Sequence, residues 1–275
     1  MRIRFWGTRG SIPTPGQRTV RYGGNTSCVE VRDSGGALLV LDAGTGLREL
    51  GLQLSQDPNG PVSLDMFISH LHWDHIQGIP FFRPAYDKRT SMRVRAPHHP
   101  RPLKELLGLG MVDPFFPVGL DAIPAKMEVA EMASGTEQQA GPFRVRATTL
   151  LHPAPALAYR VEADGRSIVY ATDTEDPFSG AVNPVVALAE RADCLIHDAQ
   201  YKDDDYKQGW GHSTIATAVD VAVRAKAKRL VLYHHDPDRS DDALDKIGAD
   251  AQRLARERGS GLEVLVAYEG MELAI

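Results

Sequence analysis

A short histidine-rich segment is the part of the sequence best suited to chemistry. Residues 69–78 read Ser-His-Leu-His-Trp-Asp-His-Ile-Gln-Gly and include His70, His72, Asp74 and His75. At a strand end, His70 and His72 leave the same side of the chain because strand side chains alternate. Four metal-binding side chains so close together exceed what one small cation easily accepts. The segment therefore predicts two adjacent metals, and a polar turn capped by Asp74 is the structural alternative.

Three further polar residues follow predicted strands later in the chain. His152 follows residues 148–151, Asp173 follows residues 168–172, and His234 follows residues 230–233. Polar side chains at strand ends are where α/β proteins build their sites. Taken singly, each has a structural alternative: a surface histidine, a turn aspartate or a buried histidine. Their distance from the histidine-rich segment decides between these interpretations.

The elements that must position these residues are mostly short strands, with helices interleaved in the last third. Periodicity and turn residues predict strands at 3–5, 27–31, 37–41, 64–69, 126–132, 143–148, 157–162, 167–171, 194–197, 229–233 and 262–266. Helices are predicted at 45–54, 182–191, 213–225 and 241–258. Asp164-Gly165 predicts a hairpin turn. This order favours two facing sheets with helices outside.

Residues 80–125 differ from the rest because they are rich in Pro, Phe and Arg, with a weak helix near 102–107. We interpret them as a long excursion that forms a lid or a substrate wall. No linker rich in Pro, Gly and Ser divides the chain, so one domain over residues 1–275 is expected.

The composition excludes several classes of protein. A hydrophobic share of 43% and a charged share of 24% in 275 residues argue against disorder and against a coiled coil. No apolar run approaches the roughly 20 residues that cross a bilayer, and the start does not resemble a signal peptide. A cytoplasmic protein with buried thiols at Cys28 and Cys194 is expected. The net charge of −5 is unlike that of a dedicated nucleic-acid binder.

The pattern His-x-His-x-Asp-His, followed by separated His, Asp and His, resembles the metallo-β-lactamase superfamily. Gly-Gly-Asn-Thr-Ser at 23–27 and Leu-Asp-Ala-Gly at 41–44 add to this resemblance, which covers most of the chain. It implies the α/β fold class, an αββα sandwich with the site at one edge of both sheets. It also implies a ligand set: His70, His72 and His152 for one metal; Asp74, His75 and His234 for the second; and Asp173 as the bridge.

The same resemblance implies roles for two neighbouring residues. Asp42 would orient a ligand. His235 is the alternative to His234, and the spacing to Pro237 favours His234. Imidazole and carboxylate ligands without thiolate suit zinc, manganese or iron, and zinc is our first choice. Two divalent ions can share a water, lower its pKa and so generate a hydroxide nucleophile. We therefore expect a hydrolase.

Three features resemble the tRNase Z branch of the superfamily. Leu-Ile-His-Asp-Ala at 195–199 contains Asp198 where that branch usually has Glu, and Gly-His-Ser-Thr at 211–214 contains His212. Residues 230–237 resemble its last ligand strand and turn. The resemblance implies that His212 protonates the leaving alkoxide and that Asp198 holds its imidazole. The alternative is a helix start that is simply capped by Ser213 or Thr214.

The chain departs from tRNase Z because we find no Gly-rich basic arm that would clamp tRNA. We therefore expect a phosphodiesterase for a small or cyclic substrate such as a cyclic nucleotide. The alternatives are a tRNase Z-like endoribonuclease, a glyoxalase-II-like thioesterase and a non-catalytic, metal-stabilised RNA-binding protein. RNA thus stays open as a partner, no membrane is expected, and the sequence gives no argument on homo-oligomers.

Overall fold

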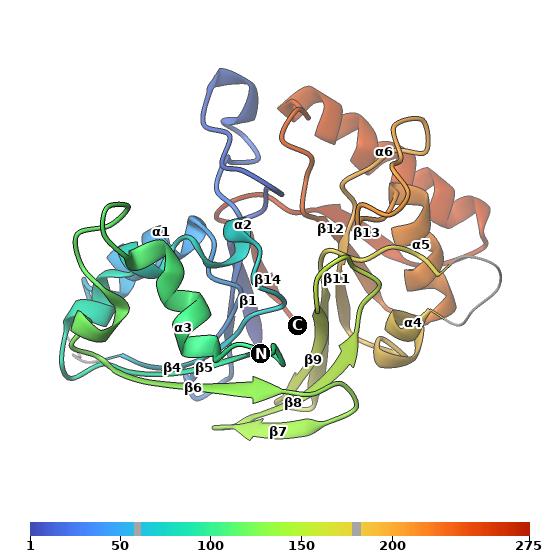
Figure 1. Cartoon of the computed structure of the whole chain (residues 1–275). Helices are drawn as coiled ribbons and strands as arrows, with labels where there is room; N and C mark the ends of the chain where they lie inside the picture. The colour runs from blue at the N-terminus through green and yellow to red at the C-terminus, as the bar shows by residue number, and fades with distance from the viewer. Residues whose placement is uncertain (58–61, 178–182) are drawn as a thin grey trace.

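The computed structural model describes residues 1–57, 62–177 and 183–275. Two seven-stranded sheets lie face to face, and helices cover the outer face of each sheet (Figure 1). This four-layer arrangement is the predicted αββα sandwich, so the expected fold class is confirmed.

The first sheet is built mainly from the N-terminal half of the chain. Its strands lie in the order β14 (Glu272–Ala274), β1 (Arg2–Gly7), β2 (Cys28–Arg32), β3 (Leu38–Leu41), β4 (Ser63–Phe67), β5 (Ser91–Pro97) and β6 (Lys126–Met132). The strands from β3 to β6 are parallel, and those from β14 to β3 are antiparallel. Helices α1 (Gly46–Leu54) and α3 (Leu103–Gly108) belong to this half (Figure 1).

The second sheet repeats this mixed pattern. Its strands lie in the order β13 (Glu263–Val266), β12 (Arg229–Tyr233), β11 (Cys194–Asp198), β10 (Arg166–Ala171), β9 (Leu157–Ala163), β8 (Phe143–Thr149) and β7 (Glu137–Ala140). The strands from β10 to β13 are parallel. Helices α4 (Pro184–Leu188), α5 (Ile215–Arg224) and α6 (Asp241–Glu257) cover its outer face (Figure 1).

Short helical segments complete the connections. The four-residue helix α2 (Trp73–Ile76) lies between the two halves (Figure 1). The 3₁₀ segments are η1 (Gln17–Thr19), η2 (Ile79–Phe81), η3 (Arg83–Tyr86), η4 (Leu109–Met111) and η5 (Leu120–Ala122).

Local signals explain several boundaries. The β9–β10 hairpin turns at Asp164 and Gly165, whose φ angles of 53° and 68° suit a two-residue turn of the predicted kind. Helix α6 begins after Ser240, whose side chain accepts a hydrogen bond from the Ala243 N–H, and Thr214 caps α5 in the same way. Each cap satisfies an N–H that a helix start leaves without a partner.

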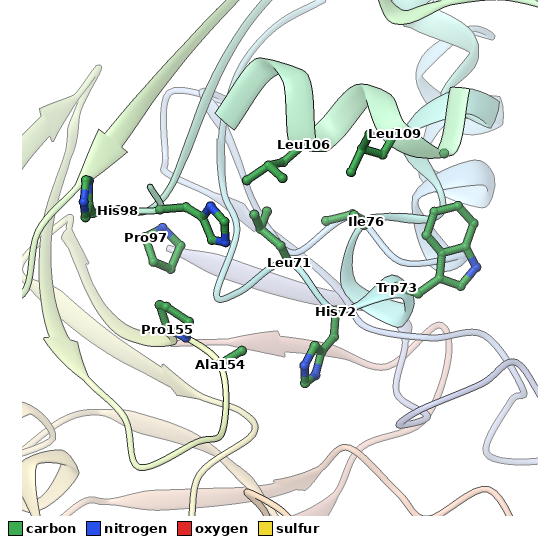
Figure 2. Close-up of a pocket in the computed structure, with 12 residues that line it drawn as sticks. Leu71, His72, Trp73, Ile76, Pro97, His98, Leu106, Leu109, Ala154 and Pro155 are labelled. Carbon is green, nitrogen blue, oxygen red and sulfur yellow. The ribbon is translucent and has the colours of Figure 1, made fainter. Parts of the chain in front are cut away.

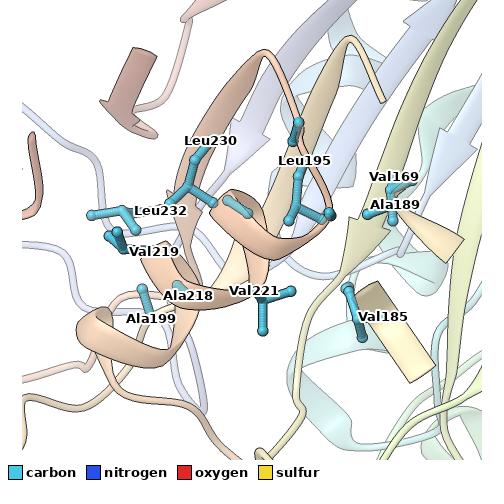
Figure 3. Close-up of a cluster of buried hydrophobic side chains, with 14 of the residues drawn as sticks. Val169, Val185, Ala189, Leu195, Ala199, Ala218, Val219, Val221, Leu230 and Leu232 are labelled. Atoms are coloured by element: carbon cyan, nitrogen blue, oxygen red, sulfur yellow. The ribbon is translucent and has the colours of Figure 1, made fainter. Parts of the chain in front are cut away.

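Three hydrophobic layers separate the four layers of structure. In β3, Leu39 and Leu41 face the second sheet, whereas Leu38 and Val40 face α1, because strand side chains alternate. The layer under α4, α5 and α6 contains small and branched side chains such as Leu195, and Figure 3 shows them packed together. Central strands such as β3 and β11 are thus buried on both faces, which explains their continuous apolar runs in the sequence.

The segment 80–125 departs from the prediction, because it is not wholly an excursion. It contains β5, an interior strand that pairs with β4 and β6. Arg93 and Arg95 alternate in this strand with buried apolar residues, and they pair with Asp65 and Glu128. The composition of the whole segment, rich in Pro, Phe and Arg, obscured this alternation. The edge strands β7 and β14 were also not predicted, because they are short and little buried.

Other predictions have mixed outcomes. Cys28 and Cys194 are buried free thiols, as expected. The predicted helix at 182–191 begins outside the described residues, within which α4 starts at Pro184. No helix in the described ranges is long and apolar enough to cross a membrane. The single domain and the cytoplasmic location stay predictions.

Candidate metal centre

The histidine-rich segment follows β4: His70 and His72 lie in the turn, and Asp74 and His75 lie in the short helix α2. His70 and His75 are fully buried, and Asp74 is almost so. Two contacts fix this turn against the second sheet: the Tyr159 hydroxyl donates to the Ile68 carbonyl at 2.6 Å, and the Leu157 N–H donates to the Ser69 carbonyl at 2.9 Å. The turn therefore lies at the edge where both sheets meet.

The three downstream residues reach the same edge from the second sheet. His152 lies in the loop after β8, Asp173 lies just after β10, and His234 immediately follows β12. Asp173 and His234 have φ angles of 52° and 57°, as does Asp42 after β3 with 60°. This left-handed conformation costs about 1–3 kcal/mol per residue and persists where surrounding structure enforces it, commonly at active sites. Here it turns each side chain toward the shared edge.

The first cluster contains His70, His72, His152 and Asp173, whose ligand atoms all lie within 4.8 Å of one another. The Nδ1 of His72 lies 3.2 Å from the Nε2 of His152. The Nε2 of His70 lies 3.6 Å from the Oδ2 of Asp173. These are the residues expected around one metal.

The second cluster contains Asp74, His75 and His234, again within 4.8 Å. The Asp74 Oδ2 lies 3.2 Å from the Nε2 of both histidines. The Asp173 Oδ1 lies 3.3 Å from His75 Nε2 and 3.2 Å from His234 Nε2. Asp173 thus presents one oxygen to each cluster, as a bridging carboxylate would.

The protonation pattern of the histidines fits metal ions. The Nδ1 of His75 donates to Asp42 at 2.7 Å, that of His152 donates to the Gly211 carbonyl at 3.1 Å, and that of His234 donates to Gln200 at 3.0 Å. A neutral imidazole has one N–H, so each Nε2 carries a lone pair toward the centre. The Nε2 atoms of His70 and His75 are buried without a hydrogen-bond partner. Such atoms suit a divalent cation, because unsatisfied buried nitrogen is costly.

The electrostatics of the clusters point the same way. Burial, together with the nearby His75, lowers the pKa of His70 well below its usual value and favours the ligating form. Burial opposes charge on Asp173 as well, yet His234 and His75 hold the pKa of this carboxyl well below its usual range. Burial opposes charge on His75 too, but Asp74, Asp173 and Asp42 raise its pKa well above the usual value, so a divalent cation bound here would displace a proton from this ring.

Asp42 lies where it was expected to orient a ligand. Besides the His75 Nδ1, it accepts hydrogen bonds from the Ser69 N–H at 2.6 Å, the Ser69 hydroxyl at 2.8 Å and the Tyr170 hydroxyl at 2.7 Å. Four donors satisfy both oxygens of this fully buried carboxylate. The His75 ring is thereby fixed by residues from both sheets.

The two neighbouring histidines at the end of β12 have different surroundings. His234 reaches both clusters through Asp74 and Asp173, whereas the His235 Nε2 donates to the Ala267 carbonyl at 2.8 Å. Burial lowers the pKa of His235 to about 3, so its ring is a neutral structural group. The geometry favours His234 as the ligand.

His212 and Asp198 lie beside the clusters. The His212 Nδ1 donates to Asp198 at 2.8 Å, and the His212 ring stacks on His234 with centroids 5.0 Å apart. Burial opposes protonation, but Asp198 prevails and raises the pKa of His212 to about 9. Thr214, not His212, caps the following helix, so capping does not account for the imidazole. The pair has the geometry of a proton donor and its holder.

Sequence reasoning missed Gln200 and Glu175, and it gave Gly211 no role beyond its place in the motif at 211–214. Glu175 accepts from the Gly211 N–H at 2.9 Å, and the Gly211 carbonyl in turn accepts from His152. Gly211 has φ 83°, and a Cβ there would lie 2.0 Å from the His152 ring. Gln200 follows the end of β11 by two residues, so its strand-end position was the one available signal.

Comparison with known proteins agrees with this fold and site. A model of the beta-lactamase superfamily domain matches residues 38–235. A protein named ribonuclease Z from Halobacterium salinarum is 31% identical over 98% of this chain and 96% of its own length. The crystal structure of human tRNase Z, short form, superposes with a TM-score of 0.70 at 24% identity, covering 100% of this chain and 99% of that chain. A metallo-β-lactamase fold protein from Bacillus subtilis gives a TM-score of 0.73 at 20% identity, with 99% of each chain covered.

The chain therefore belongs to the metallo-β-lactamase superfamily, and its centre is that of a metal-dependent hydrolase. Within the superfamily it belongs to the branch of tRNase Z and phosphodiesterase-like proteins. The alignment with the Halobacterium protein spans 319 positions against 275 residues here, so that relative has insertions that this chain lacks.

Proposed function

We propose that this protein hydrolyses phosphodiester bonds with two divalent metals, and that zinc is the metal it uses. His70, His72 and His152 would hold one ion, Asp74, His75 and His234 the other, and Asp173 both. When bound, the two ions would supply the Lewis acidity that makes water nucleophilic near neutral pH and offsets phosphoryl charge. The donor set of imidazole and carboxylate also suits manganese or iron.

The protein's own side chains have distinct tasks in this proposal. Asp42, Gln200 and the Gly211 carbonyl hold three imidazoles in the tautomer that can ligate. His212 would deliver a proton to the leaving oxygen, while Asp198 holds the ring by its Nδ1 and favours the charged form. Because Nδ1 is engaged, Nε2 is the atom that transfers the proton.

The contact between His212 and Asp198 is the observation that carries the choice of phosphodiester. A thiolate leaves without help, since a thiol has a pKa of about 8.5. An alkoxide is a much stronger base and needs a proton as the P–O bond breaks. A buried, carboxylate-held imidazole beside Asp173 meets that need and has no comparable use in thioester cleavage.

The proposed substrate is a small or cyclic phosphodiester such as a cyclic nucleotide. Support comes from the insertions of the Halobacterium relative that this chain lacks and from the absence of a clamping arm in its sequence. A tRNase Z-like endoribonuclease is the second candidate, because that relative is named ribonuclease Z.

Metal analysis of the purified protein, followed by a substrate panel, tests the proposal. The panel contains a cyclic nucleotide, an aryl phosphodiester, precursor tRNA and a thioester. We expect about two metals per chain and turnover of the first two substrates. Cleavage of the thioester alone would overturn the proposal, as would RNA binding without any hydrolysis. Turnover of precursor tRNA alone would select the second candidate.

A further inference from the structure

An apolar cavity opens beside the metal centre. Its volume is about 290 Å³, near the lower end of small-molecule sites. Figure 2 shows Leu106 and Leu109 on one side and Ala154 and Pro155 on the other, with His72 nearby. Leu71, Ile76 and Pro97 extend this apolar wall. Because His72 lines the cavity and also belongs to the first cluster, the cavity adjoins the centre.

The cavity suits an uncharged part of a substrate. No Lys, Arg, Asp or Glu stands among the described residues that line it. A phosphate group would find no cation here, whereas the adjoining clusters would hold two. A substrate that reaches both places therefore has an anionic group at the centre and an apolar group in the cavity.

An aromatic surface is available for that group. Trp73 lies between His72 and Asp74 in the chain, yet 54% of it is exposed. Its ring rests on the backbone of Gly110, where an added Cβ would approach the ring to 2.5 Å. Exposed aromatic faces of this kind stack on nucleobases without regard to sequence.

His99 adds a hydrogen-bonding atom to the lining of the cavity. The neighbouring His98 is mostly exposed, and its Nδ1 donates to Glu131 at 2.6 Å, so its ring is engaged at the rim. The His99 Nδ1 accepts from the Arg101 N–H at 3.1 Å, so its Nε2 carries the proton and is a donor. Such a donor matches an acceptor on the edge of a heterocycle better than a plain alkyl or phenyl group.

We propose that this cavity binds the nucleobase attached to the scissile phosphodiester, which makes the substrate class nucleotides. This inference rests on the proposed phosphodiesterase function. It assigns Leu106, Trp73 and His99 to substrate specificity and leaves the chemical step to the metal centre. The base belongs either to a free nucleotide or to the end of an RNA strand.

A matched pair of variants tests the cavity. Leu106→Trp fills it from α3, whereas Lys104→Trp adds the same ring to the same helix at an exposed position that is not part of the lining. Two esters with one leaving group serve as probes: p-nitrophenyl thymidine 5′-phosphate has a base, and methyl p-nitrophenyl phosphate has none. We expect Leu106→Trp to lower kcat/KM for the thymidine ester at least about tenfold and to change the methyl ester by less than about twofold. Lys104→Trp should change neither.

Binding gives a second measurement that does not depend on turnover. Calorimetry of the metal-loaded protein should show AMP binding at least about tenfold more tightly than ribose 5-phosphate, with the difference lost in Leu106→Trp. Equal binding of the two ligands to the unaltered protein would overturn the base pocket, as would equal losses on both esters. If the unaltered protein binds AMP preferentially but cleaves neither ester, the phosphodiesterase function fails while the pocket stands.

Leu106→Trp also distinguishes whether the base belongs to a free nucleotide or to the end of an RNA strand. Cyclic AMP and a short single-stranded RNA are compared as substrates of the unaltered protein and Leu106→Trp. A loss confined to cyclic AMP assigns the pocket to free nucleotides, and a loss confined to RNA assigns it to a strand end. Unchanged turnover of both would contradict the proposal.

Discussion

The two sheets contribute to the metal centre in different ways. The first sheet supplies His70, His72, Asp74 and His75 from one turn after β4. The second sheet supplies its residues from separate strand ends, so that Asp173 and His234 are 61 positions apart in the printed sequence. One contribution is local in the chain, and the other depends on the parallel order of β10, β11 and β12.

This difference shows where the centre depends on the fold as a whole. Within the turn after β4, a few backbone angles place four side chains. In the second sheet, strand pairing places the side chains, and left-handed residues after β10 and β12 aim two of them. Asp173 joins the contributions, because its two oxygens face different clusters. Substitutions in the first sheet and in the second sheet should therefore differ in their effects on metal binding, activity and stability.

Replacing Asp173 should have the largest effect. Asp173→Ala removes one oxygen from each cluster, so metal content should fall for both ions. We expect kcat/KM to fall at least about 10³-fold, since several kcal/mol of metal-derived stabilisation are lost. Metal analysis measures the metal content and kinetics measure kcat/KM. Asp250→Ala, at an exposed position of α6, is the control. Retention of two metals and full turnover would refute the bridging role.

Replacing His212 should have a large effect that depends on the leaving group. His212→Ala removes the proton donor but no proposed ligand, so metal content should stay the same. For an alkyl leaving group we expect kcat/KM to fall about 10²–10⁴-fold, whereas p-nitrophenolate, a weak base, should need little help. An equal decrease of kcat/KM on both substrates, or a loss of metal, would mean that His212 has a structural role in the centre and is not the proton donor.

Residues that hold the ligands should have intermediate effects. Asp42→Asn and Gln200→Leu each disturb one imidazole of the second cluster, and each should weaken metal binding about 10–100-fold. Asp42→Asn should also lower Tm, because four donors lose a fully charged acceptor, whereas Gln200 makes one such contact. Chelator competition and thermal unfolding measure the two effects. Equal Tm losses would contradict this asymmetry between the sheets.

Core truncations should have the smallest effect on activity. Leu47→Ala in the layer under α1 and Leu195→Ala in the layer under α5 should each cost about 2–5 kcal/mol of unfolding free energy. The folded protein should keep kcat/KM within about twofold. Denaturant unfolding followed at two wavelengths should give coincident transitions if residues 1–275 form one domain. Separate transitions for the two variants would mean that the halves unfold independently.

Sequence reasoning predicted features with a local pattern, such as turns and apolar strands, better than features that depend on residues distant in the chain. The hairpin at Asp164-Gly165 and most buried strands were expected, because turn residues and apolar runs are local signals. Strand β5 was not expected although its arginines alternate with buried apolar residues, because the composition of the surrounding segment, rich in Pro, Phe and Arg, drew the interpretation toward an excursion. Gln200 and Glu175 were missed because a lone amide or carboxylate has no pattern of its own.

By itself, the sequence determined which side chains were available and which of them follow a strand. That suffices for the turn from His70 to His75, because neighbours in the chain must be neighbours in space. Only the tertiary structure decided that His152, Asp173 and His234 meet this turn, that His235 turns away, and that His212 reaches Asp198. Those contacts depend on the pairing of distant strands and on the packing of the two sheets against each other. The burial of apolar surface throughout the core stabilises this arrangement.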